Sequence, residues 1–421
     1  MTGSETAERA GFWARTARWR ALAPVMASIC VIGTGNSLLT TSVSLELSRP
    51  EFEPRVVQVL LTGFSVGFLV GCLVARLLIT RLGHRTAFLA AGSLAAVAAF
   101  GYTATTAASV WFGLRILNGL AMAALFVVSE SWINLYADHR MRGRYFSLYM
   151  LMTSLAVLFG QLLVEAAGPR SPHLFPMAAL TICAGFLYCR FLGPWPALPA
   201  HADRPRQPDT EPGEQRYGLW RLAVLAPVTV IAVFQAGMTN MNVFALTPIY
   251  GAKIGLPAAT SVGLVTAFSL GGMVAQAPIG WLSDRLDRRI ILLIQGILAA
   301  AMCLGIIGLG NWSVTLLFAL FFLYGATALT IYPVGIAFAN SQIDSRHMVS
   351  ASGGLLLLYS VGNIMTPGLA AELMDVVSPT ALFMLLGAGA VLVAVAASFN
   401  LRRRIARVSS LPDCLVCGAN E

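Results

Sequence analysis

The sequence predicts an all-α polytopic membrane protein with twelve transmembrane helices in two pseudo-symmetric six-helix bundles. Three observations favour this fold class: a low charge content, a regular placement of basic residues, and a repeat between the two halves. Of the 421 residues, 57% are hydrophobic and 11% are charged, and the mean hydropathy is +0.74. Soluble domains carry roughly 25% charged residues, so most of this chain cannot face water.

The apolar runs set the predicted helices in order along the chain. A helix needs about 20 apolar residues to cross a hydrocarbon core of ~30 Å, and roughly twelve runs of that kind are present. They are 20–47, 54–79, 85–105, 108–137, 143–168, 173–193, 218–252, 257–282, 289–309, 312–341, 346–374 and 378–401.

Basic residues gather in every second gap between these runs and at both ends of the chain. Positively charged loops are retained in the cytoplasm, so both termini are predicted to be cytoplasmic. The net charge of +9 then reflects topology and attraction to lipid headgroups, and it does not indicate a nucleic-acid partner. The predominance of Arg over Lys favours a bacterial genome, and hence the cytoplasmic membrane of a bacterium.

A segment rich in proline and charge separates the sixth run from the seventh. Such a composition cannot form a packed core and is typical of a flexible linker. The predicted organisation is a cytoplasmic N-terminal tail at 1–19, a six-helix bundle at 20–193, a cytoplasmic linker at 194–217, a second six-helix bundle at 218–402, and a cytoplasmic C-terminal tail at 403–421.

The two halves resemble each other in sequence. A shift of 204 positions pairs residues 33–89 with 237–293 without a gap, and a shift of 206 then aligns Gly119 with Gly325. The identities include polar and glycine positions, which apolar bias does not explain. A parallel repeat of six-helix halves implies a pseudo-twofold axis along the membrane normal with a cavity at the interface, which is transporter architecture.

The gap after the eighth run carries a motif that begins at Gly280 and continues through Asp284, Arg285 and Arg289. It resembles the loop motif of the major facilitator superfamily, G-x-x-x-D-R/K-x-x-R-R/K. The resemblance implies that Gly280 allows close helix packing. It also implies that Asp284 caps a neighbouring helix or pairs with an arginine across the bundle in one conformation. A basic loop that only sets topology is the alternative.

The first-half copy of this motif departs from the pattern. Arg81, Gly83 and Arg85 persist, but Thr80 occupies the position of the acid. We therefore carry over a conformational-gate role to these three residues and no role that needs an aspartate.

The fourth run holds a second stretch that resembles this superfamily. Arg115-Ile-Leu-Asn118-Gly119 is similar to the fourth-helix motif R-x-x-Q/N-G-x-x-x-A, whose arginine the resemblance links to proton transfer. An arginine within hydrocarbon costs about 2.5–3.5 kcal/mol on insertion scales, so it normally faces a cavity or a partner. Alternatively, Arg115 lies near the external end and extends its charge to the interface.

Glu130, in the same run, is the carboxylate placed furthest inside an apolar segment. A low-dielectric surrounding favours the neutral form of a carboxyl group, which suits reversible protonation. Glu130 and Arg115 are therefore the two predicted proton-coupling residues. The alternative for Glu130 is a fixed ion pair with an arginine of the 140–144 cluster.

Amides and tyrosines inside the runs are the predicted substrate contacts. Asn36 and Asn240 come first, because they are related by the repeat and lie on the first helix of each half, which the resemblance implies lines the central cavity. The full set is Asn36, Asn240, Gln235, Asn242, Tyr332, Tyr359 and Asn363. Each side chain alone is more often an interhelical hydrogen-bonding group. The set contains no cluster of positive charge, so it favours a small neutral or amphipathic solute over a strongly anionic one.

Together these features predict a monomeric secondary transporter that works by alternating access, with no cofactor and no metal. Its partners would be a small-molecule substrate, membrane lipid and, under proton coupling, protons. The fifth run lacks the G-x-x-x-G-P antiporter signature, which keeps an uncoupled facilitator open. A lipid or lysolipid flippase and a non-transporting receptor or scaffold are also compatible with these features. No H-E-x-x-H or nucleophile-elbow motif indicates an enzyme.

Overall fold

The computed structural model of the protein describes residues 3–49, 51–136, 142–192, 227–310, 312–342 and 348–409, and every element in these ranges is helical. The N-terminal half contains α1 (Gly3–Leu47), α2 (Pro54–Ala104), α3 (Ala108–Tyr136), α4 (Arg142–Ala167), α5 (Leu174–Leu187) and the π-helical turn η1 (Tyr188–Leu192). The C-terminal half contains α7 (Pro227–Lys253), α8 (Ala258–Arg285), α9 (Arg288–Leu309), α10 (Val314–Ala328), α11 (Ile331–Gln342), α12 (Met348–Val376) and α13 (Ala381–Ser409).

Within the described residues, 11 helical segments are long and apolar enough to cross a membrane, and a shorter apolar stretch covers Val59–Ala75 in the first arm of α2. These segments confirm the all-helical polytopic fold. The helices extend beyond the predicted runs at both chain ends: α1 begins at Gly3, within the predicted tail 1–19, and α13 continues to Ser409. The predicted linker at 194–217 lies outside the described residues.

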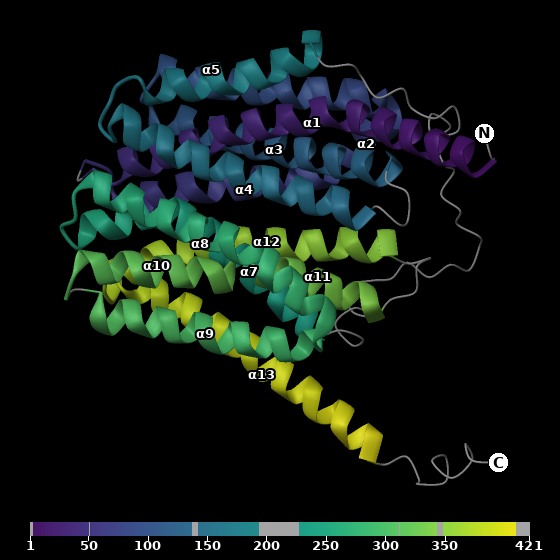
Figure 1. The fold of residues 1–421 in the computed structure, drawn as a ribbon. Helices are drawn as coiled ribbons and strands as arrows, with labels where there is room; N and C mark the ends of the chain where they lie inside the picture. Colours follow the sequence, from purple (N-terminus) through teal and green to yellow (C-terminus); the bar gives the residue numbers. More distant parts are fainter. Residues whose placement is uncertain are drawn as a thin grey trace.

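The two halves form two layers of roughly parallel helices, with both termini at the same end of the bundle (Figure 1). We call this the terminus end, and the other the opposite end. Among the described residues, the most extensive contacts between the halves are made by three helix pairs: α1 with α7, α2 with α12, and α4 with α8.

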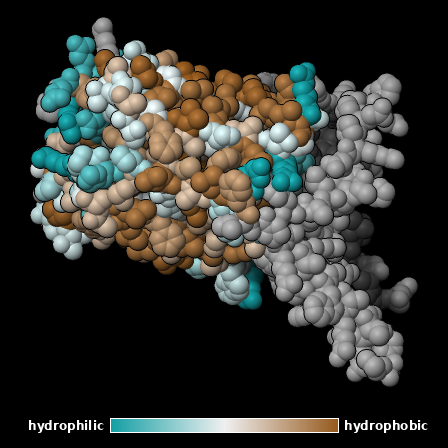
Figure 2. Space-filling view, turned by 90° about the horizontal axis from the view of Figure 1, so that it is seen from above, coloured by the Kyte–Doolittle hydropathy of each residue, from teal (hydrophilic) through white to brown (hydrophobic). Residues whose placement is uncertain are grey.

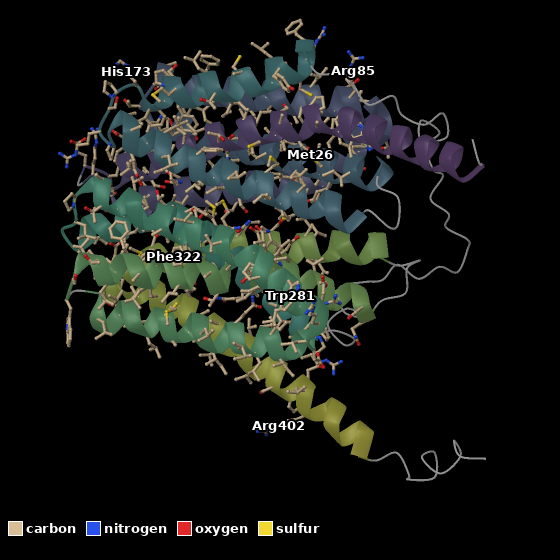
Figure 3. All side chains as sticks on the ribbon, in the orientation of Figure 1. Met26, Arg85, His173, Trp281, Phe322 and Arg402 are labelled. Atoms are coloured by element: carbon tan, nitrogen blue, oxygen red, sulfur yellow. The ribbon has the colours of Figure 1, made fainter. Side chains whose placement is uncertain are left out.

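The outer surface matches a molecule embedded in lipid. A broad hydrophobic face lies between more hydrophilic ends (Figure 2). Leu180 and Phe191, for example, have 61% and 69% of their surface exposed, which would be unfavourable in water. Figure 3 places Arg85 and Arg402 toward the terminus end and His173 at the opposite end.

Two predicted spans, 54–79 and 85–105, are joined without a loop in α2. The helical path breaks only at Gly83, whose φ is 75° and ψ is 163°. A positive φ of this size is readily available to glycine alone, so this residue type allows the two arms to join directly.

The predicted span 312–341 is instead divided into α10 and α11. Pro333 lies two residues after the start of α11 and has no backbone N–H, so it cannot donate to the carbonyl of Leu329. The break falls at Leu329 and Thr330, and the Thr330 hydroxyl donates back to the Ala326 carbonyl at 2.9 Å.

The sequence repeat is also visible in the packing. A Cβ on Gly119 of α3 would collide with the Phe64 carbonyl of α2, and a Cβ on Gly325 of α10 would collide with the Phe268 carbonyl of α8. Both pairs are related by the predicted 204 and 206 shifts. Gly67 and Gly271 likewise approach the carbonyls of Ile116 and Phe322. The same close helix crossing therefore occurs once in each half.

Candidate functional site

The boundary between the halves holds a group of polar side chains around Glu130. This residue is half-buried on α3. Its carboxylate interacts electrostatically with Cys72 of α2, Tyr149 of α4 and, from the other half, Tyr332 of α11. Within the described part of the chain it makes no hydrogen bond or ion pair. The side chains of arginines 140, 142 and 144, its predicted alternative partners, lie outside the described residues.

Tyr332 continues this group into the C-terminal half. Its ring packs edge-on against Tyr359 of α12, with centroids 5.2 Å apart and planes at 63°. The Asn240 amide on α7 donates to the Tyr359 hydroxyl at 2.6 Å. We call Glu130, Tyr149, Tyr332, Tyr359 and Asn240 the inter-half cluster. Three of these five, Asn240, Tyr332 and Tyr359, are predicted substrate contacts, and Glu130 is a predicted coupling residue.

Asn36, the repeat counterpart of Asn240, lies on α1 and is also half-buried. Its carbonyl oxygen accepts a hydrogen bond from Asn118 of α3 at 3.0 Å. The two related asparagines thus make different contacts, since Asn240 binds a tyrosine on α12. No contact joins Asn36 to the inter-half cluster among the described residues.

Two other predicted contacts lie inside the C-terminal half. Gln235 is buried and donates to the Leu386 carbonyl of α13 at 3.0 Å. Asn242 is buried and donates to Thr366 of α12 at 2.7 Å. Both amides form hydrogen bonds to neighbouring helices. This is the alternative to substrate contact that the sequence analysis gave for each of these side chains.

Asn363 lies where α2 meets α12 across the halves. The Ser65 hydroxyl of α2 donates to the Asn363 backbone carbonyl at 2.8 Å. Pro367 of α12 has no N–H and leaves that carbonyl without its helical donor, so a side chain of the other half supplies the hydrogen bond. One turn away, Cys72 Sγ lies 3.8 Å from Ser360 Oγ.

Replacing Ser65 with Ala is expected to destabilise this boundary. The Asn363 carbonyl would be left buried without a donor, which costs about 1–3 kcal/mol. Thermal unfolding of the purified protein in detergent, followed by helical circular dichroism, measures the loss.

Ser269 provides a matched control because the repeat relates it to Ser65. Its hydroxyl donates to Val265 within its own helix α8, where the carbonyl keeps its ordinary helical donor. Ser269→Ala is therefore expected to change stability by less than about 1 kcal/mol. Equal losses for the two variants would contradict the role given to Ser65.

Arg115 is fully buried, and the structure does not place it at the external interface. Its three guanidinium nitrogens have no hydrogen-bond partner among the described residues. Its Cζ lies 4.9 Å from the centroid of the Phe64 ring, and its charge also interacts with Tyr102. The hypothesis that this arginine extends to the membrane surface is wrong. The side chain lies within the N-terminal half, among helices α2 and α3.

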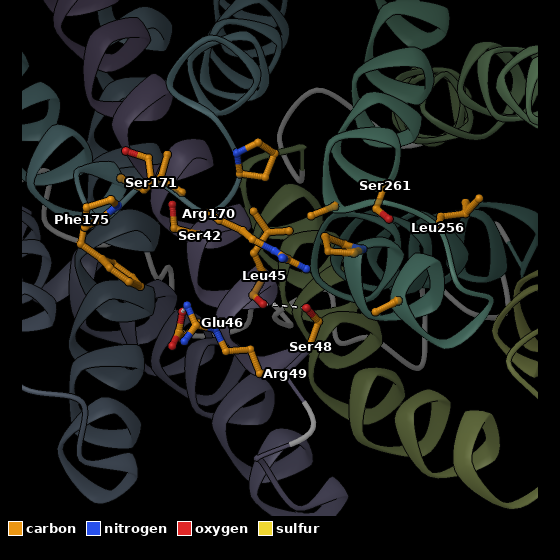
Figure 4. A pocket seen from close by; sticks show the side chains of 16 residues that line it. Ser42, Leu45, Glu46, Ser48, Arg49, Arg170, Ser171, Phe175, Leu256 and Ser261 are labelled. Carbon is orange, nitrogen blue, oxygen red and sulfur yellow. Dashed lines mark hydrogen bonds and ion pairs between the residues drawn. The ribbon is translucent and has the colours of Figure 1, made fainter.

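A cavity of about 280 Å³ lies between the halves at the opposite end (Figure 4). Glu46 of α1 and Arg49, just after the end of that helix, form an ion pair at 3.0 Å on one wall. Arg170 extends across the cavity from the α4–α5 connection, and Ser261 of α8 forms part of the other wall. On α4 near this end, Glu165 accepts a 2.6 Å hydrogen bond from Thr266 of α8, which joins the halves there.

The gate motif of the C-terminal half forms contacts within that half. Asp284 is 76% exposed and lies 3.4 Å from Arg288, and Arg285 lies over the Trp281 ring. Helix capping is supplied by Asp287, which accepts from the Arg289 N–H at 3.0 Å at the start of α9. In this conformation Gly280 makes no close helix packing with the described residues, because a Cβ there would meet none of their atoms within 4 Å. In the first-half copy, Arg81 and Arg85 are exposed beside Gly83.

Several members of the boundary were missed from the sequence: Ser65, Cys72, Tyr149 and Ser360. Small polar residues and a tyrosine in apolar runs carry no distinct signal. The one usable clue was Pro367, because a proline inside a helix always frees a carbonyl four residues earlier.

The comparisons with known proteins agree with this architecture. The family model described as Major Facilitator Superfamily matches residues 25–266 and 258–412. The chain belongs to this superfamily. Its relatives include proteins named "Uncharacterized MFS-type transporter YcaD" from Salmonella heidelberg, 27% identical over 370 residues, and from Salmonella typhi, 26% identical over 367 residues. Each alignment covers 86% of this chain and 92% of the relative.

Solved structures of superfamily members share the fold. A point mutant of the nucleoside transporter NupG matches with a TM-score of 0.70 and 14% identity, covering 91% of this chain and 99% of that one. A D-xylose-proton symporter matches with a TM-score of 0.65 and 16% identity, covering 89% and 96%. Membership of the superfamily makes this protein a multi-pass membrane transporter of a bacterial family with a small-molecule substrate.

Proposed function

We propose that this protein is a monomeric secondary active transporter of a small organic solute, coupled to protons through Glu130. It would work by alternating access in the cytoplasmic membrane, with the terminus end facing the cytoplasm, as the positive-inside rule predicts. Residues of both halves at the inter-half cluster would contact the solute as one half rocks against the other.

The carrying observation is the position of the Glu130 carboxylate. It is half-buried at the boundary, has no ion-pair partner among the described residues, and interacts with Tyr332 of the other half. An ionised carboxylate in such a place is costly, so gain or loss of one proton changes the energy of the contact between halves. A group with this property can bias the equilibrium between two packings of the halves. Arg115, buried on the same helix, remains the second coupling candidate.

Proteoliposomes loaded with a pH-sensitive dye test this proposal. Sugars, nucleosides, amino acids and organic amines are added in turn, and internal pH is followed with time. Nucleosides and sugars are included because a nucleoside transporter and a D-xylose-proton symporter share the fold. We expect at least one compound to change internal pH with the wild-type protein, and Glu130→Gln to lose that change while exchange of the labelled compound persists.

Glu165→Gln is the matched control. It removes a carboxylate of α4 that lies near the opposite end of the molecule, so this variant should keep proton movement. If Glu130→Gln moved protons as the wild-type protein does, Glu130 would have no role in proton coupling. Exchange without proton movement in the wild-type protein would indicate an uncoupled facilitator.

A second candidate function, movement of a lipid or lysolipid, is favoured by one observation. An open apolar groove of about 410 Å³ lies on the N-terminal half, lined from α1, α4 and α5 by residues that include Val31, Phe159 and Thr181. An acyl chain could lie along it. Transfer of a fluorescent lysolipid between leaflets of the same proteoliposomes, lost on Phe159→Arg and unaffected by Glu130→Gln, would support this function over the first.

A further inference from the structure

The inter-half cluster combines one carboxylate with three tyrosines. Tyr149 and Tyr332 both interact electrostatically with Glu130, from different halves of the molecule. The third ring, Tyr359, packs against Tyr332 and is held by Asn240 through its hydroxyl. The hydroxyl of Tyr359 is therefore occupied, and its ring is fixed in place beside Tyr332.

None of the described groups that interact electrostatically with Glu130 is positively charged. Within the described residues these are two phenols and the Cys72 thiol. His84 bonds Ser131 at 2.9 Å and stacks on Trp132, so this basic side chain contacts the residues that follow Glu130 on α3. The cluster thus combines a carboxylate with three aromatic rings.

This chemistry selects the class of ligand. An anion would be repelled by the ionised carboxylate, and a neutral solute would require Glu130 to bind a proton in place of a counter-charge. A metal ion is also disfavoured, because no group of three His, Cys, Asp or Glu side chains occurs in the described part of the chain. Organic ammonium groups fit best, since they are attracted both to a carboxylate and to tyrosine faces.

We propose that the solute is a small organic cation whose ammonium group binds at Glu130 between Tyr332, Tyr359 and Tyr149. This inference rests on the proposed transport function and replaces the neutral or amphipathic solute predicted from the sequence. Because Tyr332 and Tyr359 belong to one half and Glu130 and Tyr149 to the other, a bound cation would contact both halves at once.

Ligand-induced thermal stabilisation of the purified full-length protein tests the inference, because binding raises apparent stability by mass action. The probes are choline, tetraethylammonium and benzyltrimethylammonium. Dimethylbutanol, the uncharged carbon isostere of choline, and benzoate are the controls. We expect at least one ammonium compound to stabilise the wild-type protein and neither control to do so.

Variants then locate the site. Glu130→Gln is expected to weaken binding of that cation about thirtyfold or more, and Tyr332→Ala about tenfold. Tyr332→Phe keeps the ring and should therefore lose much less binding than Tyr332→Ala. Glu165→Gln, which lies outside the cluster, should bind normally. Each variant is compared only after its unliganded melting temperature is shown to match that of the wild type.

Three results would overturn the inference: no stabilisation by any ammonium compound, equal stabilisation by dimethylbutanol, or unchanged binding in Glu130→Gln. The first two use the wild-type protein alone, so they do not depend on a variant that folds. Loss of proton movement in Glu130→Gln without ammonium binding in the wild type would leave the proposed function standing and remove only the cation.

Discussion

Gly119→Ala is expected to be strongly destabilising, although the change adds only one methyl group. The new Cβ would collide with the Phe64 carbonyl and approach the Phe68 amide at 2.8 Å. Overpacking typically costs about 1–3 kcal/mol. A value near the upper end is expected here, because the obstacle is helix backbone, which moves only if α2 moves as a unit. Thermal unfolding in detergent measures the effect.

The repeat supplies a second version of this experiment. Gly325→Ala would collide in the same way with the Phe268 carbonyl in the C-terminal half, so a similar loss is expected there. Gly113, on the same helix as Gly119, has open space at its Cβ position. Gly113→Ala should be neutral or stabilising by up to about 1 kcal/mol, because alanine favours helix more than glycine does. Equal losses at 113 and 119 would contradict the close crossing.

Arg115→Met is expected to have the opposite effect, a more stable protein that transports poorly. The guanidinium is fully buried, has no hydrogen-bond partner among the described residues, and is compensated mainly by the Phe64 ring. Replacing buried ionic groups with apolar residues of similar volume is often neutral or stabilising by about 1–4 kcal/mol. Melting temperature and the proteoliposome flux, measured on the same preparation, should therefore change in opposite directions.

Arg170→Met is the control for this variant. Arg170 is exposed at the opposite end, so its replacement should change stability by less than about 0.5 kcal/mol. A large loss of stability in Arg115→Met would show that the guanidinium is well compensated in the folded protein, and normal transport would show that its charge has no part in the mechanism.

The spans and the repeat were accessible from the sequence because their causes are local. A bilayer requires long apolar helices, and a close helix crossing requires glycine at a fixed position, as at Gly119 and Gly325. Each glycine or basic residue that marks these features can be recognised from its own position in the sequence, without knowledge of its neighbours in space.

The direction in which each polar side chain points was not accessible. Gln235 and Asn240 are five residues apart on α7, yet one contacts α13 inside its half and the other contacts Tyr359 at the boundary. In a uniformly apolar helix no amphipathic pattern fixes the rotation, which depends on tertiary packing. For the same reason the sequence singled out Glu130 without revealing Tyr149 beside it.

The gate motif shows a different limit. The sequence pattern picks out its residues, but the contact each one makes depends on the conformation adopted. In this conformation Asp284 is largely exposed and the neighbouring Asp287 caps α9, a role that the spacing of the motif alone did not assign.

The single glycine that joins the two arms of α2 has a mechanical consequence. Because no loop separates the arms, any change in their relative angle has to occur in the backbone dihedrals of Gly83, and glycine accepts a wide range of these. The first arm is bonded to the partner half through Ser65, so a shift of that half would change the angle between the two arms at this one residue.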